Sequence, residues 1–430
     1  MLRIPRLPYL PDPLRRVHVP SDLESITSVG KEVDSAPLGI DPDTIARIWK
    51  AACDLYGTGV HPALQLCLRR HGQVVLDRAI GHARGNGPDD DADAPKVPVT
   101  TETPFCVFST SKAVTAIVVH LLQERGALDI ADKVTDYIPE YGVHGKQDTT
   151  IGHVLAHRAG LPGLPRAALD LDRVGDREFL GKTINESKPF IKPGTALAYH
   201  AVSGGFILGE IVQRVTGKTL RDVLSEQILG PLHFRWGNYG VSPQDVDQVG
   251  VNYTTGPRLL PPVSTLVTRV LGMPIEQVVE LSNDPRFLTA LIPSATVITS
   301  AEELSRFFEI FRCGGELNRV RVMSPATLRR ALTEQSRLEI DLSLLFPTRF
   351  SYGLMLGAKV LSLFGPDTDL AFGHLGLINI MGWADPERGI SGGLITSGKA
   401  IVYPELPLFY RVMQTIASKI PKIPESERPF

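Results

Sequence analysis

From Phe108 to Gly126 the chain reads FSTSKAVTAIVVHLLQERG, which is the most strongly patterned part of the sequence. Its apolar residues recur three and four positions apart, and this spacing predicts a helix over Ser109–Arg125 that ends at Gly126. The apolar stripe consists of Val114, Ile117, Val118, Leu121 and Leu122. Ser109 and Lys112 stand three residues apart at the start of this helix, so we expect both side chains on one face.

Ser109 is the best candidate nucleophile in the sequence. A serine hydroxyl is a weak nucleophile and needs a neighbouring group that holds or removes its proton. The amine of Lys112 can approach that hydroxyl, and the helix N-terminus favours negative charge on the serine oxygen. The alternative is a capping serine beside a surface lysine. Because an almost entirely apolar helix follows Lys112, we expect this lysine to be buried or at the edge of the core, where a charge is costly.

A second candidate is Tyr199, which small residues precede in the stretch Gly194–Tyr199 and a helix start follows at Ser203–Gly209. A tyrosine in this setting can point into a cleft. Its phenolate could act as a general base if a nearby ammonium group lowered the pKa of Tyr199. The alternative is a core tyrosine whose hydroxyl is satisfied by hydrogen bonds.

The third candidate is the tripeptide His374-Leu375-Gly376, which lies at the end of a predicted strand. Gly376 would let a substrate approach the strand closely, and a backbone N–H there can stabilise negative charge on a carbonyl oxygen. The alternative is an ordinary strand glycine next to a half-buried histidine.

The predicted elements around these candidates indicate an α+β fold. Strand signals lie near both ends of the chain and a mostly helical part separates them, which predicts an antiparallel sheet flanked by N- and C-terminal helices plus an all-α insertion. The N-terminal elements are a helix over Asp41–Tyr56 and a hairpin over Ala63–Arg69 and Val74–Gly81. The later helices cover Thr150–His157, Ala301–Cys313, Pro325–Gln335 and Glu405–Ile420. The later strands cover Tyr352–Val360, Leu370–Gly373, Ile378–Ala384 and Gly392–Thr396.

The length of 430 residues exceeds one ordinary core, since single cores stop growing near about 250–300 residues. We expect an extended N-terminal arm over 1–40, a discontinuous α/β domain over 41–163 and 291–430, and a mostly helical insertion over 164–290. Ser109 precedes this insertion, Tyr199 lies within it and His374 follows it. The insertion would therefore form part of the cleft and is no appended second domain.

Composition excludes several classes of protein. The formal net charge of −2 lacks the basic excess of a nucleic-acid-binding protein. The four cysteines lie far apart without a C-x-x-C pair, which excludes a disulfide-dense scaffold and favours a reducing compartment. Prolines interrupt any export signal within 1–20, and the most apolar segment, Ala113–Leu122, is too short to span a membrane. We therefore expect a cytoplasmic protein without stable membrane insertion.

Together, the three candidate motifs follow the order of one known superfamily. The chain resembles the serine β-lactamase and penicillin-binding-protein-like superfamily, most closely its class C-like esterase branch, the family VIII carboxylesterases. Ser109-x-x-Lys112, Tyr199 and His374-Leu375-Gly376 correspond to its S-x-x-K, Y-x-N and K-T-G positions. Supporting similarity is found at Val154–Pro162, Ile292–Ala295, Ile298–Ser300 and Gly382–Pro386, and the resemblance covers about 45–415.

The resemblance implies a serine hydrolase that cleaves carboxylic esters through an acyl-enzyme at Ser109, with Lys112 and Tyr199 in proton transfer. It implies an oxyanion hole made by the backbone N–H groups of Ser109 and Leu377, without a cofactor or a metal ion. Which of Lys112 and Tyr199 is the base stays open. The expected partner is a small-molecule ester and not nucleic acid, and a homo-oligomer is compatible with the sequence.

Two positions depart from the superfamily pattern. The Y-x-N position reads Tyr199-His200-Ala201, and His374 replaces the K-T-G lysine with a side chain that is mostly neutral near pH 7. Both changes argue against tight recognition of β-lactams or peptidoglycan and leave the groups for ester cleavage in place. We place His374, Gly376 and His200 at the substrate-binding site, where His200 or Ser203 would substitute for the missing asparagine.

Several alternatives remain open. An acyltransferase, a D-aminopeptidase or a weak β-lactamase would use the same three residues, and a catalytically silent member would bind without cleaving. Ser391 lies in a G-x-S-x-G sequence typical of α/β-hydrolases, but a predicted strand follows it where that motif needs a helix. His153 and His157 are spaced for zinc but lack an evident third ligand, so structural roles are favoured.

Apolar residues of the insertion could line an acyl pocket or could form the core of the insertion itself. The residues in question are Leu259, Leu260, Leu266, Val267 and Leu271.

Overall fold

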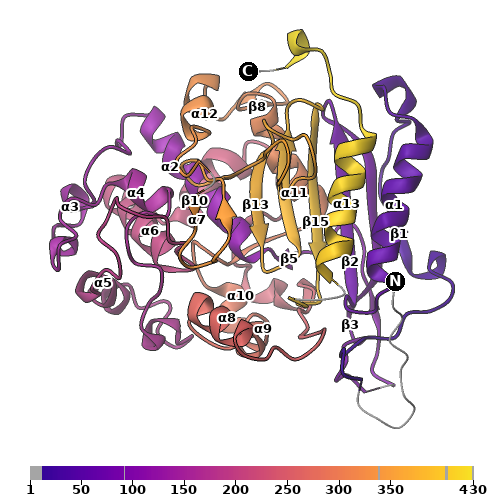
Figure 1. Cartoon of the computed structure of the whole chain (residues 1–430), viewed down its shortest axis with the longest axis horizontal. Coiled ribbons are helices and arrows are strands. Elements are labelled where there is room, and N and C mark those ends of the chain that lie inside the picture. Colours follow the sequence, from indigo (N-terminus) through magenta and orange to yellow (C-terminus); the bar gives the residue numbers. More distant parts are fainter. Residues whose placement is uncertain (1–11, 92, 338, 402–404, 429–430) are drawn as a thin grey trace.

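An antiparallel sheet of eight strands lies at the centre of the described structure (Figure 1). The computed structural model describes residues 12–428 except 92, 338 and 402–404. The strand order is β1-β3-β2-β15-β14-β13-β12, and β4 pairs with β3. The N-terminal strands are β1 (Thr27–Val29), β2 (Ala63–Arg70), β3 (Gln73–Arg84) and β4 (Val97–Pro98). The C-terminal strands are β12 (Met355–Leu356), β13 (Phe372–Gly376), β14 (Ile380–Asp385) and β15 (Ile390–Thr396).

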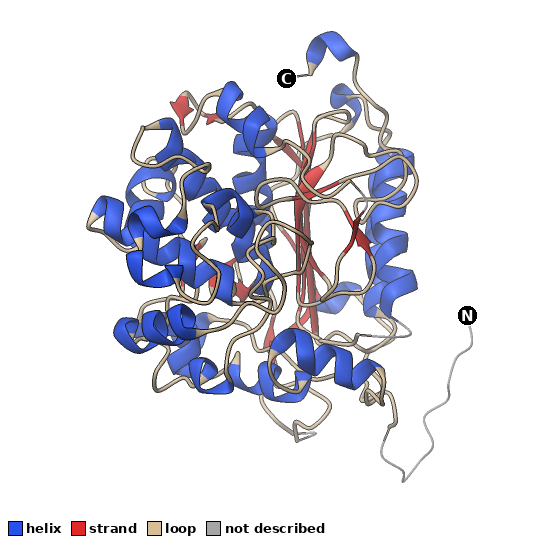
Figure 2. Ribbon diagram, turned by 60° about the vertical axis from the view of Figure 1, so that its left-hand side comes forward, coloured by secondary structure: helices blue, strands red, loops and turns tan. Residues whose placement is uncertain are grey.

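The N-terminal and C-terminal strands meet in the middle of this sheet, where β2 pairs with β15. The pair is antiparallel, with Cys67 opposite Gly393. Alternate side chains of β2 point to opposite faces, as the pleat of a strand requires. One face packs against α1 (Pro42–Tyr56) and α13 (Glu405–Lys419), and α11 (Ala301–Arg312) covers the other. Figure 2 shows the sheet edge-on between these layers. The predicted sheet with flanking terminal helices is confirmed.

Helices form most of the remaining structure, to the left of the sheet in Figure 1. They are α2 (Ser111–Glu124), α3 (Val134–Tyr137), α4 (Ile151–Leu155), α5 (Arg177–Glu186), α6 (Ser203–Thr216), α7 (Leu220–Leu224), α8 (Val263–Leu271), α9 (Ile275–Leu281), α10 (Pro285–Thr289) and α12 (Pro325–Ala331). α2 packs against α6, α7, α12 and β13 at once. Every residue from Ser111 to Leu122 is therefore buried, and not only the predicted apolar stripe.

The remaining strands are short. β5 (Phe105–Cys106), β7 (Val297–Thr299) and β6 (Asn238–Tyr239) form a three-stranded sheet beside the start of α2. β8 (Glu316–Leu317) pairs with β9 (Val320–Arg321), and β10 (Glu339–Ile340) pairs with β11 (Pro347–Thr348). β5 leads directly to Ser109, β6 lies within 164–290 and β7 follows it, so this small sheet ties the mostly helical part to the segment that carries Ser109. The part expected to be all-α therefore contains one short strand.

Some predicted elements are shorter than the sequence pattern indicated. The strand predicted over Tyr352–Val360 is reduced to β12, and Gly353, with a φ of +102°, breaks the extended backbone just before it. The helix predicted over Thr150–His157 ends at Leu155, and His157 lies in the left-handed region with a φ of +57°. The helix predicted over Pro325–Gln335 ends at Ala331.

The predicted N-terminal arm is extended only in part. Residues 1–11 lie outside the described residues. Two short 3-10 turns, Glu24–Ile26 and Ala36–Leu38, flank the strand β1, which pairs with the edge of the sheet at β3. The described part of the arm therefore covers a sheet edge. No helix among the described residues is long and apolar enough to cross a membrane.

Candidate active site

Ser109 lies in the 3-10 turn Phe108–Thr110 that leads directly into α2. Phe108 has a φ of +45°, in the left-handed region that non-glycine residues rarely adopt. The chain therefore turns sharply just before Ser109. The Ser109 side chain is half-buried and lines a cavity at the N-terminal end of α2.

The strand β13 holds this turn in place. The hydroxyl of Thr110 donates a hydrogen bond to the carbonyl oxygen of His374 at 3.2 Å. Gly376 approaches so closely that a Cβ atom there would lie 2.3 Å from the carbonyl oxygen of Val107. The absence of a side chain at Gly376 thus lets β13 pack directly against the turn, which is the close backbone approach that a strand glycine permits.

Lys112 is buried beneath Ser109, with 8% of its surface exposed. Its Nζ lies 3.0 Å from Ser109 Oγ and donates to the carbonyl oxygen of Ser294 at 3.1 Å. Burial lowers the pKa of Lys112 to about 7, because the surroundings disfavour the charged form. A substantial fraction of Lys112 is therefore neutral near pH 7, and a neutral amine can accept a proton from the Ser109 hydroxyl.

The Ser294 carbonyl is positioned by contacts between its loop and α2. The hydroxyl of Thr115 donates to the carbonyl oxygen of Pro293 at 2.6 Å. The backbone N–H of Val297 donates to the hydroxyl of Ser111 at 3.0 Å. These two contacts fasten the loop on both sides of Ser294 to the helix that carries Lys112.

Tyr199 lies against the same two groups. Its ring centre is 4.9 Å from Nζ of Lys112, and Tyr199 lines the same cavity as Ser109. Burial raises the pKa of Tyr199 well above its ordinary value, and the nearby Ser109 side chain opposes this only in part. The pKa of Tyr199 therefore moves in the direction opposite to the one that a phenolate base would need.

The loop that carries Tyr199 is held by hydrogen bonds from consecutive backbone N–H groups. Ala198 donates to the carbonyl oxygen of His157 at 3.0 Å, and His200 donates to Nδ1 of His157 at 3.2 Å. Tyr199 itself donates to Oδ1 of Asp341 at 3.1 Å. His157 therefore has a structural role, and so does His153, whose Nδ1 accepts a hydrogen bond from the backbone N–H of Thr150.

Asp341 is a functional candidate that sequence reasoning missed. Its Oδ1 also accepts hydrogen bonds from the backbone N–H groups of Ser343 at 2.8 Å and Leu344 at 3.0 Å. The carboxylate thus joins the Tyr199 loop to the loop 341–346. The one available signal was an aspartate between the apolar residues Ile340 and Leu342, because a buried carboxylate normally has a partner.

His374 and His200 lie close to the site but not in the cavity. The ring of His374 is fully buried, and its Nδ1 lies 2.8 Å from the carbonyl oxygen of Leu375. His200 Nε2 accepts a hydrogen bond from the backbone N–H of Leu161 at 3.3 Å. Burial, reinforced by the nearby Lys112, lowers the pKa of each histidine to about 3. Both are neutral, and neither histidine is among the residues that line the cavity, so their contact with substrate stays a prediction.

Ser203, the other residue expected to substitute for the missing asparagine, is likewise not among the residues that line the cavity. The hydroxyl of Ser203 is buried and donates to the carbonyl oxygen of Leu161. It therefore joins the start of α6 to the segment around Leu161.

A cavity of about 390 Å³ opens beside Ser109, and Tyr199, Gly376 and Leu377 also line it. Its remaining walls come mainly from apolar residues of the segment 168–174, α8, α9 and the loop 341–346, and α6 contributes Phe206. Leu266, Val267 and Leu271 are among them. Leu259 and Leu260 are not, and Leu260 is 69% exposed. Among the described residues, no charged side chain lines this cavity.

Two sites considered from the sequence do not form near this cavity. Ser391 is buried inside β15 and pairs across the sheet with Arg69, so it is not in a nucleophile elbow. Among the described residues, no group of three or more histidine, cysteine, aspartate or glutamate side chains is arranged to hold a metal ion.

The protein-family model described as Beta-lactamase matches residues 47–404. The chain belongs to the β-lactamase family. The matched range includes Ser109, Lys112, Tyr199 and His374, so it covers all three predicted motifs. The prediction that the chain is an enzyme of the serine-hydrolase type is confirmed at this level.

Individual relatives agree with this assignment. The esterase/β-lactamase LipL of Mycobacterium tuberculosis is 28% identical over 324 residues, which cover 70% of each chain. A penicillin-binding protein homologue from Caulobacter crescentus has a TM-score of 0.75 at 26% identity, covering 88% of this chain and 98% of that chain. A family VIII carboxylesterase has a TM-score of 0.72 at 24% identity, covering 86% and 96%, and this likeness concerns the fold. The predicted superfamily resemblance is confirmed.

Proposed function

We propose that this β-lactamase-family enzyme cleaves carboxylic esters through an acyl-enzyme at Ser109. The observation that carries the proposal is the 3.0 Å contact between Ser109 Oγ and a buried Lys112 amine whose pKa is lowered to about 7. Such an amine combines a lone pair at neutral pH with hydrogen-bonding distance to the hydroxyl that it would deprotonate.

In the acylation step, Ser109 Oγ attacks the ester carbonyl carbon and its proton passes to Lys112. The carbonyl oxygen becomes an oxyanion, which the backbone N–H groups of Ser109 and Leu377 would stabilise. The bond to the alcohol oxygen then breaks, and the alcohol leaves with the proton that Lys112 returns through the Tyr199 hydroxyl. In deacylation a water molecule attacks the acyl carbon, its proton passes to the same pair, and Ser109 Oγ leaves and is protonated again.

The roles of Lys112 and Tyr199 follow from the opposite directions of their pKa shifts. Burial favours the neutral form of each side chain, which is an amine for Lys112 and a phenol for Tyr199. A neutral amine is a base and a phenol is a hydrogen-bond donor and proton relay. We therefore assign the base to Lys112 and the relay to Tyr199.

An uncharged ester suits the cavity better than a β-lactam. β-Lactam antibiotics carry a carboxylate, which needs a cation or several donors at the binding site. The described lining holds no lysine or arginine, and the pKa of His374 is lowered to about 3, so this histidine offers no charge. His374 therefore acts through the backbone of β13, which positions the Ser109 turn and Leu377.

The proposed reaction uses groups of this chain and water, with a small-molecule ester as the partner. We place the reaction in the cytoplasm, because all four cysteines lie among the described residues and none forms a disulfide. Homo-oligomerisation stays a prediction, which sedimentation velocity would test directly.

Labelling with a small fluorophosphonate probe tests the proposal. The wild-type enzyme and Ser391→Ala should be labelled, whereas Ser109→Ala should not, because Ser391 is buried in the sheet and Ser109 lines the cavity. Hydrolysis of p-nitrophenyl acetate and of a chromogenic cephalosporin should be measured on the same samples. Retained labelling of Ser109→Ala would contradict the proposal, and so would a kcat/KM for the cephalosporin above that for the ester.

A further inference from the structure

Helix α8 forms one wall of the cavity beside Ser109 and leaves its polar side to solvent. Leu266, Val267, Val270 and Leu271 line the cavity, at the spacing of one helix face, while Thr265 and Arg269 are exposed. None of the residues of α8 is fully buried, and the helix packs mainly on α9. The apolar face of α8 therefore borders the cavity and not further protein core. It is suited to contact an apolar ligand inside the cavity.

The acyl group is the part of an ester that must fit within these walls. It stays bonded to Ser109 from the first attack until water releases it, whereas the alcohol leaves after the first step. A volume of about 390 Å³ lies within the range of small-molecule sites. Because apolar walls favour apolar groups and the described lining has no charge, the cavity suits an extended hydrocarbon chain better than a polar or charged group.

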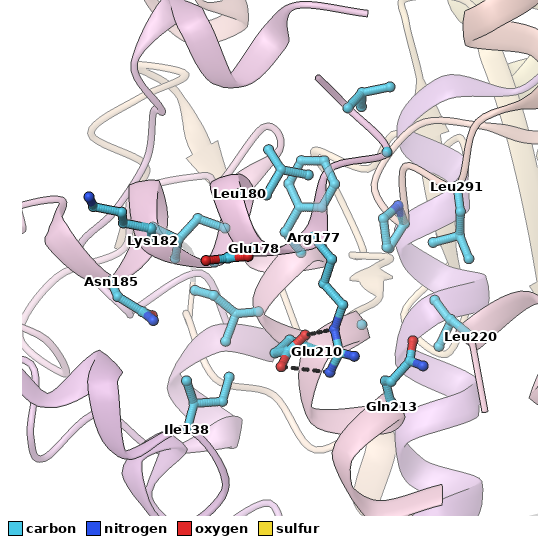
Figure 3. Close-up of a pocket in the computed structure, with 18 of the residues that line it drawn as sticks. Ile138, Arg177, Glu178, Leu180, Lys182, Asn185, Glu210, Gln213, Leu220 and Leu291 are labelled. Atoms are coloured by element: carbon cyan, nitrogen blue, oxygen red, sulfur yellow. Dashed lines mark hydrogen bonds and ion pairs between the residues drawn. The ribbon is translucent and has the colours of Figure 1, made fainter. Parts of the chain in front are cut away.

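A second cavity of about 1170 Å³ adjoins the first, and the three residues that line both cavities form the partition between them. Leu171, Val174 and Phe206 line both cavities. The second cavity is polar in part, and Figure 3 shows Arg177 and Glu210 facing each other in it as an ion pair. An apolar chain that passed the partition would therefore meet charged groups and lose the favourable burial.

We propose that the enzyme selects esters with an extended apolar acyl chain, and that Phe206, with Leu171 and Val174, sets the upper limit of its length. This inference rests on the proposed acyl-enzyme at Ser109. Phe206 comes from α6 and the other two residues from the segment before α5, so the limit depends on how these two segments pack.

The kcat/KM values for p-nitrophenyl acetate, butyrate, hexanoate, octanoate and dodecanoate test the selectivity. Each added methylene that enters the cavity should raise kcat/KM about fourfold, which corresponds to about 0.8 kcal/mol, until the chain reaches the partition. Val267→Trp on α8 should lower the ratio of octanoate to acetate by about tenfold or more. Thr265→Trp, on the exposed side of the same helix, is the matched control and should leave that ratio unchanged.

Phe206→Ala tests the partition, because loss of the ring joins the two cavities. It should move the chain length at which kcat/KM stops rising to a longer ester. Leu291→Ala removes a side chain that lines only the second cavity, and should not move that limit (Figure 3). Melting temperatures of all variants identify any that fail to fold.

The outcomes separate this inference from the proposed function. If Ser109 is labelled and p-nitrophenyl acetate is turned over, but kcat/KM does not rise with acyl chain length, the inference is overturned and the proposed function stands. Equal loss of acetate and octanoate hydrolysis in Val267→Trp would overturn the inference as well. If kcat/KM of Phe206→Ala stops rising at the same chain length as in the wild-type enzyme, the partition does not set the limit. Absence of both labelling and acetate turnover in the folded wild-type protein would instead overturn the proposed function.

Discussion

The carboxylate of Asp341 accepts a hydrogen bond from the backbone N–H of Tyr199 at 3.1 Å. The same oxygen accepts hydrogen bonds from the loop 341–346, and that loop contributes Leu344 and Phe346 to the cavity wall. One buried carboxylate thus positions both the proposed proton relay and part of the acyl site. It touches neither substrate nor reacting atoms, so Asp341 is a positioning residue.

Asp341→Ala should therefore lower stability and turnover together, whereas Asp341→Asn should restore most of both. The amide oxygen of asparagine can accept the same three hydrogen bonds, but alanine leaves three buried N–H groups without their acceptor. Each unsatisfied group costs about 1–3 kcal/mol. Chemical denaturation and kcat for a p-nitrophenyl ester measure the two effects. Equal losses in both variants would contradict the positioning role.

Lys112→Ala and Tyr199→Phe should each reduce turnover by roughly 10²–10⁴-fold, the usual contribution of a proton-transfer group. The reason is that Lys112 Nζ lies 3.0 Å from Ser109 Oγ, and that Tyr199 lines the same cavity beside both groups. Steady-state rates with p-nitrophenyl butyrate, together with circular dichroism to establish folding, provide the measurement. Wild-type rates in either folded variant would rule out the role assigned to that residue.

The pH dependence of kcat/KM should follow the ionisation of the Lys112 amine. Only its neutral form can take the proton of Ser109, and burial lowers the pKa of Lys112 to about 7. Activity should therefore be low in acid, rise as pH increases through about 7, and level off above it. A rise with its midpoint near pH 10 would show an ordinary lysine instead. The residual activity of Lys112→Ala should lack this rise.

The substitution His374→Lys restores the superfamily residue at the K-T-G position, but it should not create a β-lactamase. The side chain at this position is fully buried and does not line the cavity, so a lysine there would lose its hydration without reaching a substrate carboxylate. We expect a lower melting temperature and no rise in hydrolysis of a chromogenic cephalosporin. A gain of tenfold or more would show that position 374 does reach the substrate.

Much of the fold was predictable because it depends on local pattern. The hairpin of β2 and β3 follows from apolar segments around His71-Gly72, and α2 follows from the spacing after Ser109. The strand predicted over Tyr352–Val360 was too long, and it begins only at Met355 because Gly353 adopts a φ of +102°, which the spacing of apolar residues does not reveal. Asp341 was missed because its partners lie in the Tyr199 loop, far away in the sequence.

The sequence by itself determined the class of enzyme, because the order of Ser109-x-x-Lys112, Tyr199 and His374-Leu375-Gly376 is a property of the chain alone. Only the tertiary structure decided how these residues work. Burial sets the pKa of Lys112 and Tyr199 in opposite directions, and burial is a sum over neighbours from distant segments. The same packing buries His374 outside the cavity lining and places Phe206 of α6 and the apolar face of α8 around one cavity, where an acyl chain would lie.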